Sequence, residues 1–318
     1  MKQKMKKRMF TVFLAVCSIL ALGLASGTEA FAATAKFKIG YSCNNFNDTF
    51  QTYIVDAARA AAVEAGVDLE VLDAQEDDIR QQDQVNNLIQ NGVDALIVVP
   101  VNTGSVQPII KAAADAKKPL VFVNRNPYPS GGMPENVYFT GADSILEGSS
   151  QMEYAGKLMG GKGNICILMG ILSNEGALGR TAGIEQTVQE KFPDIKILAK
   201  ETGNWQRDQG LNITENWLTA YGEQINAILS NNDEMALGAI MALENAGRQD
   251  VLVFGNDAIP DALAAIKSGK LGGTVLQDPV AQGKGSLEIT VKILNGEKVE
   301  QLQKLPADVI NKDNINNQ

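Results

Sequence analysis

The sequence contains no histidine among its 318 residues. Histidine is the most common general base and a frequent metal ligand, so a Ser-His or Cys-His catalytic pair cannot be built from this chain. Cysteine is scarce as well: Cys17 lies near the N-terminus, and Cys43 and Cys166 lie in apolar segments far apart in the sequence. Without histidine or a Cys-x-x-Cys pair we expect no metal site, and we expect Cys43 and Cys166 to be buried thiols.

The glycine signatures of nucleotide-binding proteins are also missing. The run Met159-Gly160-Gly161-Lys162-Gly163-Asn164 lacks the spacing of a phosphate-binding loop and precedes an apolar segment instead of opening a helix. No Gly-x-Gly-x-x-Gly pattern follows the first apolar segment, so a dinucleotide site is not indicated. We therefore expect a tight turn at this run and no bound cofactor.

The first 32 residues have the pattern of an export signal. Five basic residues precede an apolar run at 9–24, and Ala30-Phe31-Ala32 fits a small-x-small cleavage site. The run is short for a membrane span, and no cysteine follows it where a lipid could be attached. We expect a free protein that begins near Ala33 and works in the periplasm. Its 23 basic and 36 acidic residues give a net charge of −13, which disfavours binding to nucleic acid and anionic membranes.

After the leader, short apolar runs alternate with segments of helical pattern. The runs at 37–43, 95–99 and 119–123 predict parallel strands with helical crossovers, in a sheet covered on both faces. A Pro- and Gly-rich loop near 127–135 is followed by a second run with the same order of elements. This order predicts an α/β protein with two lobes of one type. We expect the N-terminal lobe at 33–142 plus 278–306 and the C-terminal lobe at 143–277 plus 307–318.

Polar clusters follow three of the predicted strands. They are Asn124-Arg125-Asn126, Asn232-Asp233 and Asn256-Asp257. Ligands of open α/β sheets bind at the carboxyl ends of the strands, so the three clusters indicate one cleft. Asp233 is also expected to cap the helix that follows it, because a carboxylate there can accept from the free N–H groups of the first turn.

The residues at the predicted strand ends suit a neutral polyol. Carboxylates, amides and the forked donors of arginine can bind hydroxyls in the plane of a ring, and aromatic rings can cover its C–H faces. The polar candidates are Asp48, Asn124, Arg125, Arg180, Asn232, Asp257 and Gln277, and the aromatic candidates are Phe50 and Trp205. Each has an ordinary structural alternative, such as a helix cap for Asp48 or a solvated charge for Arg180.

Almost all of the chain after the leader resembles the periplasmic sugar-binding proteins of the ribose type, the solute receptors of ABC importers. The resemblance is carried by Asn232-Asp233-Glu234-Met235-Ala236-Leu237-Gly238, Asn124-Arg125, Gly255-Asn256-Asp257, Arg180-Thr181-x-Gly183, and Lys270-Leu271 running to Gln277. It implies the type I fold, with two Rossmann-like lobes joined by three crossings and the ligand between them. It also implies that the nine candidates named above are ligand contacts.

Two departures bear on the ligand that this resemblance implies. The ribose receptors carry a second adjacent phenylalanine where this chain has Gln51, and an asparagine before proline where it has Val99. The stretches Val123–Pro127 and Gly170–Asn174 are more similar to the inositol and rhizopine receptors. The hypothesis is therefore a monomeric receptor for myo-inositol or a related cyclitol, with ribose or an aldohexose such as galactose or glucose as the alternative. An ABC permease of the inner membrane is the expected partner, and a chemoreceptor is compatible with it.

Two other classes of function fit the sequence poorly. A sugar-responsive transcription regulator would need a helix-turn-helix at the N-terminus, where this chain has the predicted leader. An enzyme would have to use carboxylates such as Asp233 and Asp257, because histidine is absent. We therefore expect a receptor without catalytic residues.

Overall fold

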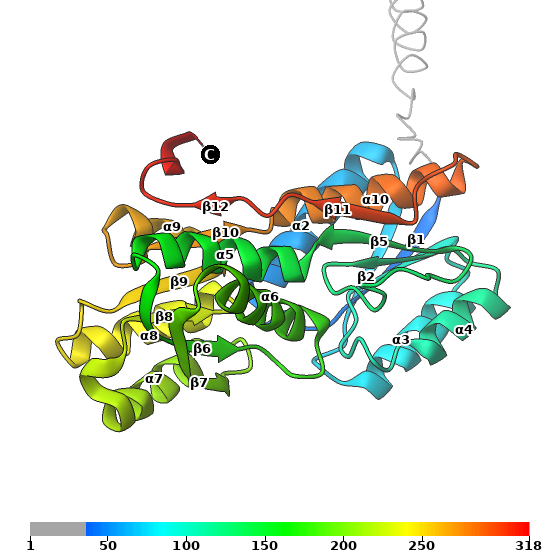
Figure 1. Cartoon of the computed structure of the whole chain (residues 1–318). Helices are drawn as coiled ribbons and strands as arrows, with labels where there is room; N and C mark the ends of the chain where they lie inside the picture. The colour runs from blue at the N-terminus through cyan, green and yellow to red at the C-terminus, as the bar shows by residue number, and fades with distance from the viewer. Residues whose placement is uncertain (1–35, 318) are drawn as a thin grey trace, which may run out of the picture. The chain divides into compact units, whose positions relative to one another are not determined.

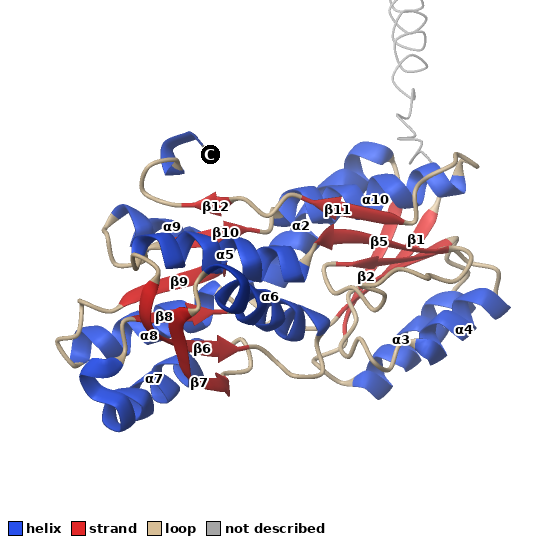
Figure 2. Cartoon of the chain, viewed as in Figure 1, coloured by secondary structure: helices blue, strands red, loops and turns tan. Residues whose placement is uncertain are grey.

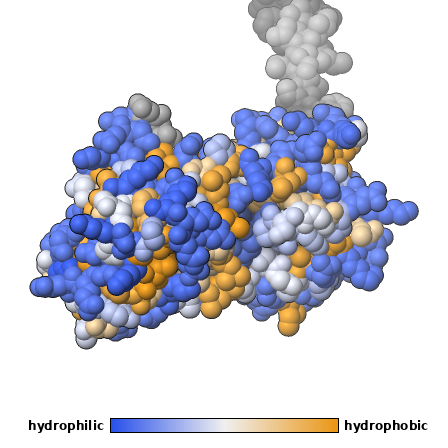
Figure 3. All heavy atoms as spheres, viewed as in Figure 1, coloured by the Kyte–Doolittle hydropathy of each residue, from blue (hydrophilic) through white to orange (hydrophobic). Residues whose placement is uncertain are grey.

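The computed structural model describes residues 36–317, so the predicted signal at 1–32 lies outside the described residues. The described chain forms two six-stranded sheets, each with helices on both faces (Figures 1 and 2). Hydrophilic residues cover most of the face drawn in Figure 3, with smaller apolar groups between them. Over residues 36–317, no helix is both long and apolar enough to cross a membrane.

The first sheet is entirely parallel. Its strands are β1 (Lys38–Cys43), β2 (Asp68–Asp73), β3 (Ala95–Val98), β4 (Leu120–Val123), β5 (Val137–Ala142) and β11 (Leu302–Leu305), in the order β11-β5-β4-β3-β1-β2. Its helices are α2 (Thr49–Ala65), α3 (Asp78–Gln90), α4 (Gln107–Asp115) and α10 (Pro279–Leu294). Helices α2 and α10 pack together, and α3 packs with α4. Residues of α3 and α4 belong to an apolar cluster separate from that of α2. Helix α10, which comes late in the sequence, therefore packs against the first sheet.

The second sheet repeats this winding. Its strands are β6 (Lys162–Met169), β7 (Asp194–Thr202), β8 (Ala227–Ser230), β9 (Leu252–Asp257), β10 (Gly273–Leu276) and β12 (Val309–Ile310), in the order β12-β10-β9-β8-β6-β7. Its helices are α5 (Ser144–Leu158), α6 (Glu175–Lys191), α7 (Arg207–Tyr221), α8 (Asp233–Asn245) and α9 (Pro260–Lys267), with short 3-10 turns at Gly222–Gln224 and Ile315–Asn317. The chain passes between the sheets after β5, after β10 and after β11, which are the three crossings expected.

The last two strands differ from the expectation. No strand was predicted at β11, whose sequence Leu-Gln-Lys-Leu has little apolar signal of its own and is a strand because it pairs with the edge of β5. The final strand β12 was expected in a parallel sheet but pairs antiparallel with β10. The reason is the short connection between the last two strands. Strand β11 runs toward the second sheet, and β12 continues in the same direction, which is opposite to the direction of β10.

Two helices begin directly after a polar residue that caps them. Helix α2 starts at Thr49, and α6 starts at Glu175. The side chains of Asp48 and Asn174 cap these two helices, so the first turn forms directly after the loop that follows each strand. The two strand cysteines are free and buried, and burial raises the pKa of both the Cys43 and the Cys166 thiol to about 12.

Candidate functional site

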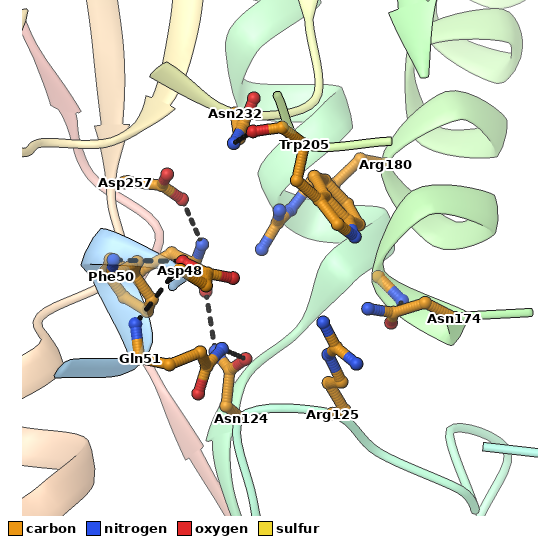
Figure 4. A pocket seen from close by; sticks show the side chains of 12 residues that line it. Asp48, Phe50, Gln51, Asn124, Arg125, Asn174, Arg180, Trp205, Asn232 and Asp257 are labelled. Atoms are coloured by element: carbon orange, nitrogen blue, oxygen red, sulfur yellow. Dashed lines mark hydrogen bonds between the residues drawn. The ribbon is translucent and has the colours of Figure 1, made fainter. Parts of the chain in front are cut away.

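The structure places all nine predicted ligand residues around one pocket. The pocket occupies about 370 Å³, its opening included, and is also lined by Gln51, Asn174 and Gly176. Four of the nine follow strands of the first sheet: Asp48, Phe50, Asn124 and Arg125. The other five follow strands of the second sheet: Arg180, Trp205, Asn232, Asp257 and Gln277 (Figure 4). The carboxyl ends of both sheets thus contribute to a single site.

Three polar clusters were expected at this cleft, and each contributes only part of its residues. Asn126 turns aside and accepts from the backbone N–H of Tyr128 at 2.8 Å. Asn256 lies behind the pocket, with Nδ2 3.5 Å from Oε1 of Glu147. The lining side chains from these clusters are Asn124, Arg125, Asn232 and Asp257.

Asp233 does not cap helix α8, contrary to the prediction. The cap is Asn232, whose Oδ1 accepts from the N–H of Met235 at 3.0 Å. The carboxylate of Asp233 is buried and accepts from Oγ1 of Thr274 at 2.7 Å and from the N–H of Ile259 at 3.0 Å. It touches the backbone of Gly255, where an added Cβ would lie 2.0 Å from Oδ1. Asp233 therefore joins strands β9 and β10 beneath the pocket.

A chain of amides crosses the pocket floor. Gln51 donates to Oδ1 of Asn124 at 2.8 Å, Asn124 donates to Oε1 of Gln277 at 3.1 Å, and Gln277 donates to Oδ1 of Asp257 at 2.5 Å. The direction of the chain is fixed by Gln282, which donates to the carbonyl of Gln277 and must therefore accept from Asn124. The amides link the first lobe to the second and orient the carboxylate of Asp257.

Burial raises the pKa of the acidic side chains at and beneath the pocket. Burial raises the pKa of Asp48, and Arg125 opposes that rise. The pKa of Asp257 is raised by burial and by the nearby Asp233, against the lowering effect of Arg180. Burial also raises the pKa of Asp233. The two acidic side chains can accept hydrogen bonds from a ligand rich in hydroxyls, and the two arginines that they face can donate hydrogen bonds to it.

Each arginine is held by a different set of partners. Arg125 donates through Nη1 to the carbonyls of Pro100 and Val101 at 3.0 and 3.2 Å, and Nη2 lies 3.3 Å from Oε1 of Glu76. Arg180 donates through Nε to Oε2 of Glu147 at 2.8 Å and through Nη1 to the carbonyl of Asn231 at 2.8 Å. Both side chains are therefore fixed before any ligand enters.

Strained backbone occurs at three lining residues. Asn124, Trp205 and Asp257 have φ angles of 67°, 68° and 132°, which are uncommon for residues with side chains and are most costly for a bulky one. Trp205 is held there by Asn232, whose Nδ2 donates to its carbonyl at 3.1 Å. Its ring packs against Gly170, where an added Cβ would lie 2.0 Å from the indole. The surrounding structure therefore fixes the indole against the pocket.

Gln51, Asn174 and Gly176 were not among the predicted ligand residues. Gln51 was noted only as a departure from the ribose receptors, and Asn174 only as part of a subfamily motif. The same rule that selected Asn232 would have selected Asn174, because it lies between a strand and the helix that it caps. Val99, the second departure, is buried and does not line the pocket. Among residues 36–317, no group of three or more Cys, Asp or Glu side chains is placed to hold a metal ion.

Comparisons with known proteins agree with this arrangement. Residues 39–298 match the family model described as the periplasmic binding protein domain. The chain is 40% identical over 298 residues to a putative rhizopine-binding protein of Rhizobium meliloti, covering 92% of this chain and 96% of that one. It is 33% identical over 285 residues to the ribose import binding protein of Salmonella typhimurium, covering 89% and 93%.

A solved structure is similar over nearly the same length. It is an ABC transporter solute-binding protein of Bacillus halodurans with bound myo-inositol, at 38% identity and a TM-score of 0.83. The match covers 89% of this chain and 97% of that protein.

Proposed function

The chain belongs to the periplasmic binding protein family, and on that premise we propose that it is the exported receptor of an ABC importer for a cyclic polyol, with myo-inositol as the first candidate. The observation that carries the proposal is a pocket between the sheets, where each lobe contributes one carboxylate and one arginine to the lining. The resemblance to a relative named for rhizopine and to a structure with bound myo-inositol supports this ligand class.

In this proposal both lobes supply contacts to the ligand. Phe50 and Trp205 hold the faces of the ring, while Asp48, Asn124 and Arg125 bind hydroxyls from the first lobe. Arg180, Asn232, Asp257 and Gln277 bind hydroxyls from the second. Only the closed form makes both sets of contacts, so the ligand shifts the equilibrium toward it. A permease can then distinguish the closed surface from that of the empty receptor.

The pocket floor favours a cyclitol over ribose. Gln51 stands where the ribose receptors have an aromatic ring, and its amide is the first member of the chain that ends at Asp257. A polar side chain at position 51 suits a cyclitol, whose ring has a hydroxyl on every carbon. It suits ribose less well, because part of the ribose ring carries no hydroxyl. Ribose is the second candidate because the ribose receptor is a relative over most of the chain.

We further propose that the protein is cleaved near Ala32 and acts in the periplasm as a monomer. The family membership supports export, and the sequence of the first 32 residues supports the cleavage point. N-terminal sequencing of the protein from a periplasmic extract tests the cleavage point and the location.

We also propose two lobes, 33–142 with 278–306 and 143–277 with 307–318. These bounds put each crossing between elements that belong to different sheets.

Calorimetric titration of the ligand-stripped protein tests the ligand. The panel is myo-inositol, scyllo-inositol, ribose, galactose and glucose. Tight one-to-one binding of an inositol, with weak or absent ribose binding, is the expected result. Preference for ribose or an aldohexose would keep the receptor but overturn the cyclitol, and silence across the panel would overturn the ligand class.

Substitution Asp257→Ala tests the position of the site. The change leaves Gln277 and the ligand hydroxyls without a buried acceptor, so we expect myo-inositol affinity to fall by about 1–3 kcal/mol or more. Asp250→Ala is the matched control, since Asp250 pairs with Arg248 on the surface away from the pocket. Parent-like binding by Asp257→Ala would mean that the site is wrongly placed.

A further inference from the structure

A threonine of the first lobe holds the backbone on both sides of Asn174 in the second. Thr103 lies between β3 and α4, and its N–H and Oγ1 donate to the carbonyl of Ser173 at 3.2 and 3.3 Å. The N–H of Glu175 in turn donates to Oγ1 of Thr103 at 3.0 Å. Since the partners come from different lobes, these bonds exist only while the lobes are closed.

The side chain of Asn174 has a fixed direction. It is buried, and its Oδ1 accepts from the N–H of Gly176 at 2.8 Å as the cap of α6. A backbone N–H can only donate, so Oδ1 must face the helix and Nδ2 is left as the donor for the pocket. Figure 4 shows the Asn174 amide turned into the pocket, toward Arg125 and Trp205.

Trp205 offers a second donor at the same place. Its Nε1 is buried and has no hydrogen-bond partner among the described residues. In Figure 4 the indole nitrogen faces the space between Asn174 and Arg125. An indole N–H can only donate, and a buried donor left without an acceptor is unfavourable. This corner therefore lacks an acceptor that the ligand can supply.

We propose that Asn174 and Trp205 form, beside Arg125, a donor corner that binds an acceptor oxygen of the ligand, and that Thr103 is the positioning residue for Asn174 on closure. The inference deepens the proposed function and rests on it. A hydroxyl oxygen on the ring suits the corner, since it can accept from more than one donor. The corner makes the receptor select for a hydroxyl at one ring position.

Asn174→Ser tests the donor, because serine keeps a cap oxygen for α6 and removes the amide N–H. The probes are myo-inositol and its monodeoxy analogues, titrated by calorimetry. We expect the parent to lose roughly tenfold in affinity for the analogue that lacks the hydroxyl at the corner, and the variant to show little of that loss. Trp205→Phe, which keeps an aromatic ring without the N–H, is expected to reduce the loss for the same analogue.

Two results separate this inference from the proposed function. If the parent binds an inositol and Asn174→Ser discriminates among the analogues as the parent does, the donor corner is overturned. If the parent prefers another sugar of the panel, the cyclitol proposal fails instead. The same variants, titrated with that sugar and its deoxy analogues, then decide on the corner.

Thr103→Val tests the positioning role, with Thr103→Ser as the control that keeps the hydroxyl. Valine removes the acceptor for Glu175, so we expect a several-fold loss of myo-inositol affinity in the parent background and none with serine. A residue that acts through Asn174 should have little effect once Asn174 is already serine. Equal losses in both backgrounds would overturn the positioning role, and so would parent-like binding by Thr103→Val.

Discussion

The two lobes present the same guanidinium group to the pocket but support it in different ways. Arg125 of the first lobe rests on two backbone carbonyls and on Glu76, whose side chain is 25% exposed. Arg180 of the second lobe pairs with Glu147, whose side chain is 1% exposed, and its guanidinium carbon lies 5.8 Å from the centre of the Trp205 ring. Burial lowers the pKa of Arg180, but Glu147, Asp257 and Glu175 together outweigh that effect and the net shift is upward.

The difference shows that a binding group can be fixed by dipoles or by a buried charge. Carbonyl oxygens remain neutral when their arginine is removed, and water can reach the partly exposed Glu76. Glu147 would remain as an uncompensated charge in the interior, which is among the most costly defects in a protein. The two arginines should therefore contribute similarly to ligand binding and unequally to stability.

Arg180→Met gives the largest expected effect. The free energy of unfolding without ligand should fall by about 3–5 kcal/mol, because Glu147 loses its only close cation in the described chain. Urea denaturation measures the loss. The double variant Arg180→Met with Glu147→Gln should recover much of it, since the buried charge is gone, and no recovery would contradict the role assigned to Glu147.

Arg125→Met should have a smaller effect on stability. The carbonyls of Pro100 and Val101 lose their donor, for which we expect about 1–3 kcal/mol in the same denaturation experiment. Myo-inositol affinity should fall as strongly as in Arg180→Met. A stability loss equal to that of Arg180→Met would erase the contrast between the two lobes.

Glu175→Gln gives the smallest expected effect on stability. Glu175 is a third carboxylate, close to the ion pair of Arg180 and Glu147. Burial raises the pKa of Glu175 to about 7, which Ser144 and Arg180 oppose and Glu147 reinforces. The folded chain then binds more protons than the unfolded chain between its ordinary pKa and pH 7, so this residue makes stability fall as pH rises through that range. The glutamine variant should remove about 1–2 kcal/mol of that fall. Urea denaturation at pH 5 and pH 8 measures it, and an unchanged pH dependence would contradict the assignment.

The order of elements was predictable because periodicity is a local property. Ala95–Val98 and Leu120–Val123 are buried strands, as their continuous apolar character indicates, and Asn124 and Arg125 after the second of them line the pocket. Strand β11 was not predictable, since only the edge of β5 makes it a strand. Asp233 was assigned to a cap because its sequence neighbours allow that role, whereas Thr274 and Ile259, distant in sequence, determine its actual one.

The sequence alone determined the alternation of strands and helices, the residues that follow the strand ends, and the family. These features follow from side-chain types at short spacing. The tertiary structure decided which polar groups are satisfied by the protein and which face the pocket. Nδ2 of Asn174 faces the pocket because a backbone N–H binds the other end of that amide. Nε1 of Trp205 faces the pocket because the strained backbone of its loop fixes the side chain. Such directions depend on contacts between residues far apart in the chain, which periodicity does not record.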